Sequence, residues 1–338
     1  MKILYAIQGT GNGQVSRATE VLPVIRRYAD VDVFVSGGNS NIDLPFPVKY
    51  NSKGFSFEYD NHGRLNLSST FRKIEPLRLW KEIRDLPVKE YDLVINDFEF
   101  ISARSARYHN VPSISFSHQA ALLSDQTPRP SGFNAAGKLL LSQYAPAPYA
   151  IGLHFHTYDD FIFTPVIRKE IRMLQPQSKG HYAVYLPAVG DKQLLQVLHQ
   201  LPEMRWEVFS RTTSYPYIQK NVSIRPAQNE AFIKSLEMCN GLLTGAGFES
   251  PAEAMYLGKK LFVIPIHGQY EQQCNAAALK KMGVRTADRF SEDLIPELLK
   301  WAQSTSVINV HYPDITEKIV EQMLFDPQPY FLPALGVG

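Results

Sequence analysis

Residues 245–276 read GAGFESPAEAMYLGKKLFVIPIHGQYEQQCNA. This pattern predicts a glycine turn, a helix over residues 248–257, a short buried strand, a loop, and a second helix that begins near Tyr270. Both helices begin on the same side of that strand. Because a helix N-terminus carries unpaired N–H groups and a partial positive charge, the stretch predicts a seat for a phosphorylated ligand. Gly245 and Gly247 lack a Cβ and allow that ligand to approach the backbone closely.

Four polar side chains in the two predicted helices carry groups that bind sugars and phosphates. Ser250 and Glu253 lie three residues apart on one face of the first helix, and Glu271 and Gln272 stand together at the head of the second. A carboxylate accepts hydrogen bonds from a sugar diol, whereas hydroxyl and amide groups bond phosphate and sugar oxygens. A single glutamate or serine in a first helical turn is more often a cap or a dipole partner, so the combination carries the prediction.

The composition predicts a soluble two-domain protein that does not bind nucleic acid. The 338 residues are 44% hydrophobic, which is enough for two separate cores, and the net charge is only +2. Cys239 and Cys274 lack metal-ligand spacing, which favours a reduced cytoplasm over a disulfide scaffold or a zinc site. No segment approaches the roughly 20 apolar residues of a membrane span. We therefore expect a cytoplasmic protein, with peripheral contact at the inner face of a membrane left open.

Strands and helices alternate along the first half of the chain. Apolar runs predict strands at residues 3–7, 31–37, 91–97 and 112–118, and helical spacing predicts helices at 15–28, 74–86 and 99–108. Apolar strands in this alternation predict a mostly parallel sheet covered on both faces. The helix at 74–86 is rich in Arg and Lys, which is typical of a solvated face but also suits an anionic acceptor or lipid headgroups. Residues 121–150 predict a long excursion at the carboxyl edge of the sheet.

A second alternation of strands and helices follows a polar linker. The sequence therefore predicts an α/β protein with two doubly wound, Rossmann-like domains that face a central cleft. We expect an N-terminal, acceptor-side domain over residues 1–164 and a C-terminal, nucleotide-sugar-binding domain over 178–312. A C-terminal helix and tail over 313–338 are expected to return to the first domain.

The C-terminal stretch resembles a known family signature. The resemblance rests on Gly247, Ser250, Glu253, Gly258, Pro265, Glu271, Gln272, Asn275 and Ala276. Their order is similar to the nucleotide-sugar signature of inverting glycosyltransferases with the GT-B fold. These include the peptidoglycan N-acetylglucosaminyltransferases that form lipid II and the UDP-glycosyltransferases of small molecules. The N-terminal glycine loop, the His-Gln pair at 118 and 119 after the expected last strand of the first domain, and the TPVIR sequence at 164–168 support the likeness, which covers most of the chain.

The resemblance implies a role for each matching residue. Glu253 would hold the ribose hydroxyls of a UDP-sugar, Gly247 and Ser250 the diphosphate, and Glu271 with Gln272 the transferred sugar. The donor site it implies comprises Gly245, Gly247, Ser250, Glu253, Glu271, Gln272 and Asn275, with residues 225–229 beside the base. Retaining relatives use two glutamates eight positions apart, and here the first of them would fall on Gly245, which favours inversion.

The expected catalytic base is missing from this sequence. In similar enzymes a His in the N-terminal glycine loop deprotonates the acceptor, and an Asp at the end of a later strand holds it. The loop here contains Gly11, Asn12 and Gly13 as candidate acceptor and phosphate contacts, followed by Gln14, which has no useful basicity. Asp97 or His118 could act instead, the chain could be catalytically weak, or Gln14 could differ from the natural residue. Asp97 could equally be a helix N-cap, and His118 a hydrogen-bonding residue.

Other ligand classes fit less well. The glycine loop lacks GxGxxG spacing, and residues 36–38 lack the acidic residue that would hold an NAD ribose. Asp30 and Asp32 resemble a metal-binding DxD only superficially, and we expect neither a metal nor a cofactor. A nucleotide-sugar 2-epimerase and a non-catalytic nucleotide-sugar-binding protein remain alternatives to the glycosyltransferase. The sugar and the acceptor (a lipid-linked saccharide, a glycan or a small molecule) stay open.

Overall fold

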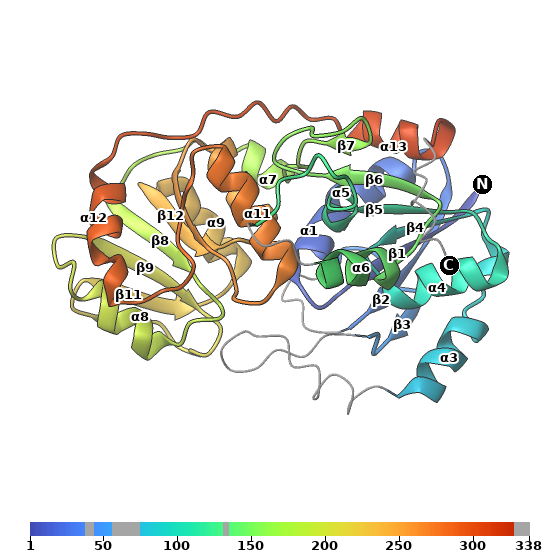
Figure 1. The fold of residues 1–338 in the computed structure, drawn as a ribbon, viewed down its shortest axis with the longest axis horizontal. Helices are drawn as coiled ribbons and strands as arrows, with labels where there is room; N and C mark the ends of the chain where they lie inside the picture. The colour runs from blue at the N-terminus through green and yellow to red at the C-terminus, as the bar shows by residue number, and fades with distance from the viewer. Residues whose placement is uncertain (38–43, 56–74, 131–134, 328–338) are drawn as a thin grey trace.

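The chain folds into two parallel-dominated sheets, each with its own helices (Figure 1). The structure is a computed structural model that describes residues 1–37, 44–55, 75–130 and 135–327. Both sheets contain seven strands in the order β3-β2-β1-β4-β5-β6-β7 and β10-β11-β9-β8-β12-β13-β14. All pairings are parallel except the one between β10 and β11. This arrangement confirms the predicted α/β class.

The N-terminal sheet occupies the first half of the chain. Its strands are β1 (Lys2–Gln8), β2 (Asp30–Ser36), β3 (Tyr50–Ser52), β4 (Leu93–Asp97), β5 (Ser113–Ser117), β6 (Tyr149–Leu153) and β7 (Ile162–Phe163). Its helices are α1 (Asn12–Ile25), α3 (Pro76–Asp85), α4 (Phe100–His109), α5 (His118–Ala121) and α6 (Ala135–Tyr144), with a 3-10 turn η1 (Val88–Glu90). The β1 run KILYAIQ is almost wholly buried, as expected for a central parallel strand.

The C-terminal sheet repeats this plan. Its strands are β8 (His181–Tyr185), β9 (Arg205–Ser210), β10 (Tyr217–Gln219), β11 (Val222–Pro226), β12 (Gly241–Gly245), β13 (Lys260–Ile264) and β14 (Arg285–Thr286). Its helices are α8 (Asp191–Leu198), α9 (Asn229–Met238), α10 (Glu249–Tyr256), α11 (Tyr270–Lys281) and α12 (Ile295–Gln303), with a 3-10 turn η2 (Glu292–Leu294). The short helix α7 (Lys169–Arg172) joins the halves, and α13 (Thr316–Phe325) follows them.

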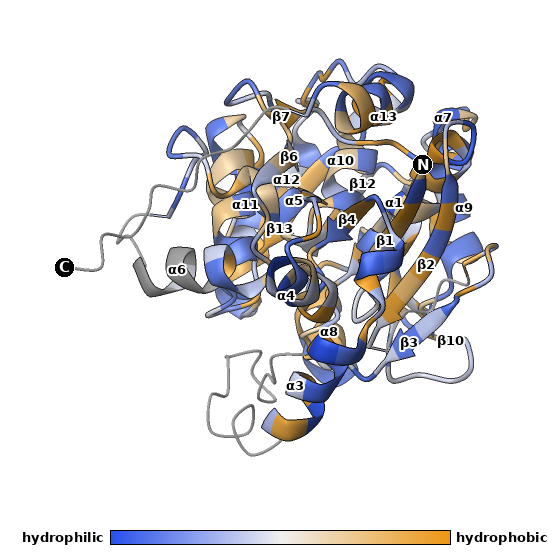
Figure 2. Cartoon of the chain, turned by 90° about the vertical axis from the view of Figure 1, so that its right-hand side faces the viewer, coloured by the Kyte–Doolittle hydropathy of each residue, from blue (hydrophilic) through white to orange (hydrophobic). Residues whose placement is uncertain are grey.

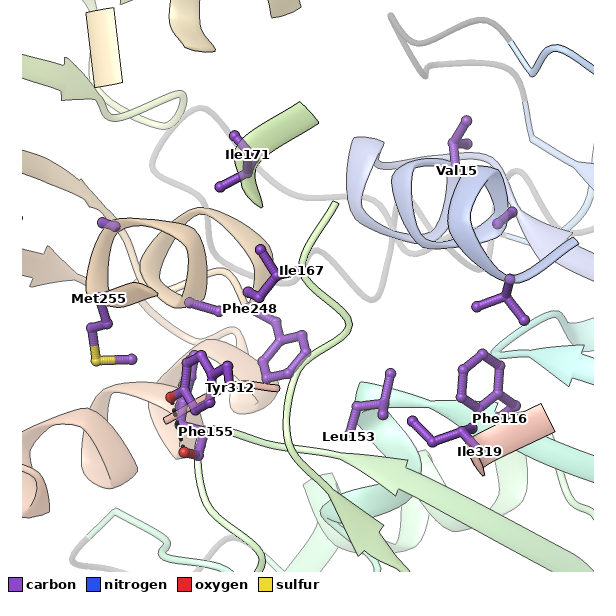
Figure 3. Close-up of a cluster of buried hydrophobic side chains, with 14 of the residues drawn as sticks. Val15, Phe116, Leu153, Phe155, Ile167, Ile171, Phe248, Met255, Tyr312 and Ile319 are labelled. Atoms are coloured by element: carbon purple, nitrogen blue, oxygen red, sulfur yellow. Dashed lines mark hydrogen bonds between the residues drawn. The ribbon is translucent and has the colours of Figure 1, made fainter. Parts of the chain in front are cut away.

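Buried apolar side chains from both halves of the chain pack against one another. One hydrophobic cluster runs from the inner face of the N-terminal sheet through the linker to α10. In Figure 3, Phe248 from the start of α10 lies beside Ile167 of the linker and near Phe155; the two phenyl centroids are 5.0 Å apart. Tyr312 donates a hydrogen bond from its hydroxyl to the Phe155 carbonyl at 2.9 Å. Hydrophobic burial of this kind holds the two sheets in a fixed relation.

The C-terminal helix α13 packs on α1 of the N-terminal half, as Figure 1 shows. Arg27 and Tyr28, just after α1, both contact the Glu317 carboxylate of α13. The Tyr28 and Phe325 rings meet edge to face at 5.6 Å. These contacts bring the end of the described chain back across the linker.

The basic residues of α3 lie on a solvated face. Figure 2 colours most of α3 hydrophilic and most of β2 hydrophobic. Arg78 pairs with Glu82 at 2.9 Å, and Arg84 pairs with Asp85 at 2.7 Å. The neighbouring Arg72 and Lys73 lie outside the described residues. Within the described part of the chain, no helix is long and apolar enough to cross a membrane.

Two expectations about the N-terminal half are corrected. His118 does not follow the last strand of this half, because β6 and β7 come after it. Asp97 is not the cap of α4, because the Glu99 carboxylate accepts the hydrogen bonds of the Ile101 and Ser102 amides at 2.9 and 2.6 Å. Glutamate reaches these amides across a turn that begins with Phe98 at φ 53°.

Candidate functional site

A cavity of about 280 Å³ opens between the carboxyl edges of the two sheets. The loop after β1 contributes Thr10 and Gly11, and the first turns of α1 add Asn12, Gly13 and Ser16. The linker contributes Arg168. The C-terminal half supplies Tyr185, Phe209, Arg211, Ala227, Gln228, Asn229, Phe232, Gly247, Phe248, Glu249, Ser250, Glu253 and Gln272. Loops at the carboxyl ends of parallel strands thus meet from both sheets, which is where doubly wound folds bind ligands.

The N-terminus of α10 lies in the wall of this cavity. Gly247 and Ser250 both line it, and a Cβ added to Gly247 would meet no atom within 4 Å. The first-turn amides of a helix have no intrahelical acceptor, so this wall presents free donors and the positive end of the helix dipole. The arrangement can hold an anionic group.

Glu253 lines the cavity and is held in place by the linker. Arg168 donates to both carboxylate oxygens, from Nε at 2.6 Å and from Nη2 at 2.9 Å. The Glu253 side chain is 4% exposed and the Arg168 side chain is 9% exposed. Burial raises the pKa of Glu253, and the Arg168 charge opposes that effect. Arg168 Nη1 also donates to Asn229 at 2.9 Å, so the linker arginine orders one end of the cavity.

A second buried arginine links the two halves. Arg17 on α1 donates from Nη2 to Asp97 Oδ1 at 2.7 Å and from Nε to Asp97 Oδ2 at 3.0 Å. Its Nη1 donates to Glu249 Oε1 of α10 at 2.8 Å. Arg17 is 3% exposed and Asp97 is fully buried. Burial raises the pKa of Asp97 to about 6, whereas the Arg17 guanidinium works in the opposite direction.

The Glu249 carboxylate contacts the N-terminal glycine loop at Gly13. A Cβ placed on Gly13 would lie 2.3 Å from Glu249 Oε2, closer than any carbon–oxygen contact allows. Glycine is therefore required at this position for the carboxylate of α10 to reach the loop. The contact joins the N-terminal loop to the wall that carries Gly247 and Ser250.

Glu271 faces the N-terminal half. Its Oε2 accepts a hydrogen bond from Gln119 Nε2 at 3.0 Å, and its Oε1 lies 3.6 Å from His118 Nε2. Burial is the main cause that raises the pKa of Glu271 to about 7. His118 donates from Nδ1 to the Leu153 carbonyl at 3.2 Å, and its ring stacks on Phe248 with centroids 4.3 Å apart. Burial lowers the pKa of His118, which keeps the imidazole neutral.

The cavity brings together only part of the predicted site. Gly11, Asn12, Gly13, Gly247, Ser250, Glu253 and Gln272 line it, together with residues 227–229. Asp97, His118, Gln14, Gly245, Glu271 and Asn275 do not. Asn275 is buried and donates to the Ala246 carbonyl at 2.9 Å, so it fixes the turn before α10. Arg225, predicted near the base, pairs with Glu207 at 2.8 Å.

Sequence reasoning missed Arg17, Glu249 and Arg168 as site residues. Arg168 ends the TPVIR sequence that supported the resemblance, and Glu249 lies within the helix signature itself. Arg17 gave a weaker signal, a cation in an otherwise apolar face of α1. A charged residue on the buried side of a helix predicts a charged partner, although it does not identify which carboxylate that is. Among the described residues, no group of three or more His, Cys, Asp or Glu side chains has the arrangement of a metal site.

Comparisons with known proteins agree with this architecture. The chain is similar to MurG of Acinetobacter baumannii, at 14% identity over 95% of this chain and 98% of that one, with a TM-score of 0.55. It is also similar to the Arabidopsis thaliana protein UGT89C1 complexed with UDP, at 16% identity, 95% and 94% coverage and a TM-score of 0.56. A UDP-N-acetylglucosamine 2-epimerase aligns at 12% identity over 96% of both chains, with a TM-score of 0.55. Identities this low indicate a shared fold alone.

The sequence itself establishes the family. No protein of curated function matches it significantly. The model of the family "Glycosyl transferase family 1" matches residues 1–301, which is most of the chain. The predicted resemblance and the predicted fold are thereby confirmed. The chain belongs to glycosyl transferase family 1 and has the GT-B fold.

Proposed function

We propose that the protein transfers a sugar from a UDP-sugar to an acceptor hydroxyl, with inversion at the anomeric carbon and without a required metal ion. The single observation that carries the proposal is the cavity between the two sheets, which joins the glycine loop after β1 to the N-terminus of α10. A donor seated there would present its sugar to both halves of the chain. The sugar and the acceptor are not specified by these residues.

The diphosphate of the donor is proposed to lie at the N-terminus of α10, beside Gly247 and Ser250. Helix N-termini bind phosphates through free N–H groups and the helix dipole. Arg168, which lines the cavity, supplies positive charge nearby, and Arg17 lies behind the same wall. Fixed dipoles and cations stabilise a departing diphosphate, so a metal ion is not needed in this account.

The ribose is proposed to bind Glu253, which is engaged by Arg168 in the ligand-free protein. Each carboxylate oxygen has two acceptor positions, so Glu253 can accept from a ribose diol while it keeps its contact with Arg168. Tyr185, Phe209 and Phe232 line the same region, and the Phe209 and Phe232 centroids are 5.3 Å apart. They offer apolar surface to a nucleobase, in keeping with the UDP found in UGT89C1.

The transferred sugar is proposed to lie against Gln272, which lines the cavity, with Glu271 behind it. Gln272 Oε1 accepts from the Ile266 amide at 3.0 Å, which leaves its amide N–H₂ group for a sugar oxygen. Inversion is supported by the sequence, because Gly245 stands where retaining relatives have a glutamate.

A binding experiment tests the donor site. Thermal unfolding is measured with UDP, UDP-N-acetylglucosamine, UDP-glucose and, as a mismatch, ADP. A ligand at 100 times its Kd stabilises a folded protein by about 2.7 kcal/mol. We expect uridine nucleotides to stabilise the wild-type protein. This stabilisation should be lost in Glu253→Ala and kept in Glu230→Ala. Glu230 is an exposed first-turn glutamate on α9 that does not line the cavity. Stabilisation that is equal for ADP and UDP, or unchanged in Glu253→Ala, would contradict the proposal. Turnover that survives EDTA is also expected.

A 2-epimerase is the alternative enzyme, because a UDP-N-acetylglucosamine 2-epimerase shares the fold over 96% of both chains. Release of UDP together with a rearranged free sugar, in the absence of any acceptor, would favour it. Gln14 also keeps a non-catalytic nucleotide-sugar-binding protein as an alternative. Uridine-nucleotide binding without turnover, even after Gln14→His, would favour that function.

A further inference from the structure

We propose that Glu249 is the catalytic base that takes the proton from the acceptor hydroxyl. This inference rests on the proposed glycosyl transfer. A base is needed elsewhere because the side-chain amide of Gln14, in the glycine loop, cannot accept that proton. A carboxylate from the opposite half of the chain reaches the same loop instead.

The position of Glu249 suits this role. Glu249 lines the cavity together with Gly11, Gly13 and Ser16 of the N-terminal half. Oε2 lies against Gly13, immediately before Gln14. The Glu249 side chain is 28% exposed. Oε1 accepts from Arg17, whereas Oε2 accepts no hydrogen bond from any described residue. One carboxylate oxygen is therefore open to an acceptor in the cavity.

The other carboxylates near the cavity are occupied. Asp97 is fully buried, and both of its oxygens accept from Arg17. Glu253 is bonded through both oxygens to Arg168, and its remaining acceptor positions are those assigned to the ribose of the donor. Glu271 does not line the cavity, and one of its oxygens accepts from Gln119.

The two histidines next to these groups are also enclosed. His118 is 2% exposed, and His154 is fully buried. Neither lines the cavity. His118 stacks on Phe248, and its Nδ1 is used in a hydrogen bond to the Leu153 carbonyl. A base must come within hydrogen-bond distance of the proton it takes, and of these groups Glu249 alone has an oxygen placed to do so.

Arg17 and Asp97 are positioning residues in this account. Asp97 fixes the guanidinium with two hydrogen bonds from inside the N-terminal half, and the guanidinium directs Oε1 of Glu249. The arrangement holds Oε2 against the glycine loop. Asp97 thus orients the base through an arginine.

The proposed step balances without any further reactant. Glu249 Oε2 takes the proton of the acceptor O–H as the acceptor oxygen forms its bond to the anomeric carbon. The bond between that carbon and the β-phosphate oxygen breaks, and its electron pair leaves with UDP. The products are the glycoside, UDP and a protonated Glu249, which then gives its proton to solvent.

The test uses Glu249→Gln in the full chain. Glutamine keeps an oxygen for Arg17 but cannot take a proton, so it separates basicity from positioning. The rate measured is UDP release from UDP-N-acetylglucosamine, UDP-glucose and UDP-galactose with water as the acceptor, and UDP affinity is measured by calorimetry. General-base catalysis contributes typically 10²–10⁴-fold, so a loss of about 100-fold or more at unchanged UDP affinity is expected. Glu230→Gln, an exposed first-turn glutamate of α9, serves as the matched control.

Two further readouts distinguish a base from a structural residue. Formate should restore part of the rate of Glu249→Ala, because it supplies the missing carboxylate in the cavity. Gln14→His in the Glu249→Gln background should also recover activity, since it returns a base to the loop.

Two results would overturn the inference while leaving the proposed function in place. One is a Glu249→Gln rate equal to that of Glu230→Gln. The other is a parallel loss of rate and UDP affinity without formate rescue, which would make Glu249 a donor-binding residue. A wild-type protein that binds no uridine nucleotide would overturn the proposed function itself, and the inference with it.

Discussion

Replacement of Asp97 by Asn should destabilise the protein strongly, because it leaves the buried charge of Arg17 without its main anionic partner. Asn has nearly the same size and shape as Asp, so the change removes the negative charge with little change in packing. The Arg17 guanidinium, 3% exposed, then keeps a single anionic partner, Glu249, at 2.8 Å. Any loss of stability would therefore report the ion pair itself.

The expected magnitude follows from the burial of the pair. Removal of one partner of a buried ion pair typically costs about 3–5 kcal/mol. Glu249 still compensates part of the Arg17 charge, so we expect the lower end of this range, about 3 kcal/mol. For a domain of 150–250 residues, each kcal/mol lowers the unfolding temperature by roughly 2–4 °C. The predicted fall is therefore about 6–12 °C.

Differential scanning calorimetry at neutral pH measures this fall. Asp85→Asn is the matched control, because Asp85 forms an exposed pair with Arg84, and it should leave the unfolding temperature unchanged. Addition of Arg17→Met to Asp97→Asn removes the stranded cation and should recover part of the loss. A shift in Asp97→Asn no larger than that in Asp85→Asn, or a further fall in the double variant, would refute the reasoning.

Two more predictions concern residues at the contact between the halves. The folded-state pKa of Glu271, about 7, exceeds its ordinary value of 4.5. Its contribution to stability is therefore fully present below about pH 4.5 and lost as the pH rises through about 7. Glu271→Gln should remove this dependence. The unfolding temperature of the variant, relative to that of the wild type, should therefore rise between about pH 5 and pH 8. A difference between the two unfolding temperatures that stays constant over this pH range would contradict the prediction. Gly13→Ala should displace Glu249, whose Oε2 lies 2.3 Å from the new Cβ, and should lower UDP release as Glu249→Gln does. Gly190→Ala, where a Cβ meets nothing within 4 Å, is the control, and equal rates in the two variants would contradict the contact.

The sequence predicted the fold because its signal is local. The α4 helix, predicted at 99–108, spans residues 100–109, and α10 begins one residue from its predicted start. The edge strands β3, β10 and β14 were missed, because they have two or three residues each and so little burial that no periodicity develops. The buried strand β6 was missed as well, because it begins at the end of the stretch interpreted as an excursion.

The candidate site was less predictable, because its contacts join distant parts of the chain. Arg17 and Asp97 are 80 residues apart, and Arg17 and Glu249 are 232 apart. Spacing rules identify which residues share a helix face, but they cannot pair an arginine with a carboxylate from another domain. The same limit explains Glu253, whose partner Arg168 lies 85 residues away in the linker.

The most direct test of the donor site is a crystal structure of the protein with UDP. We expect the ribose hydroxyls within hydrogen-bond distance of Glu253 and the diphosphate at the N-terminus of α10, against Gly247 and Ser250. A nucleotide bound outside the cavity would contradict the account. So would a ribose turned away from Glu253 while Arg168 retains both of its carboxylate oxygens.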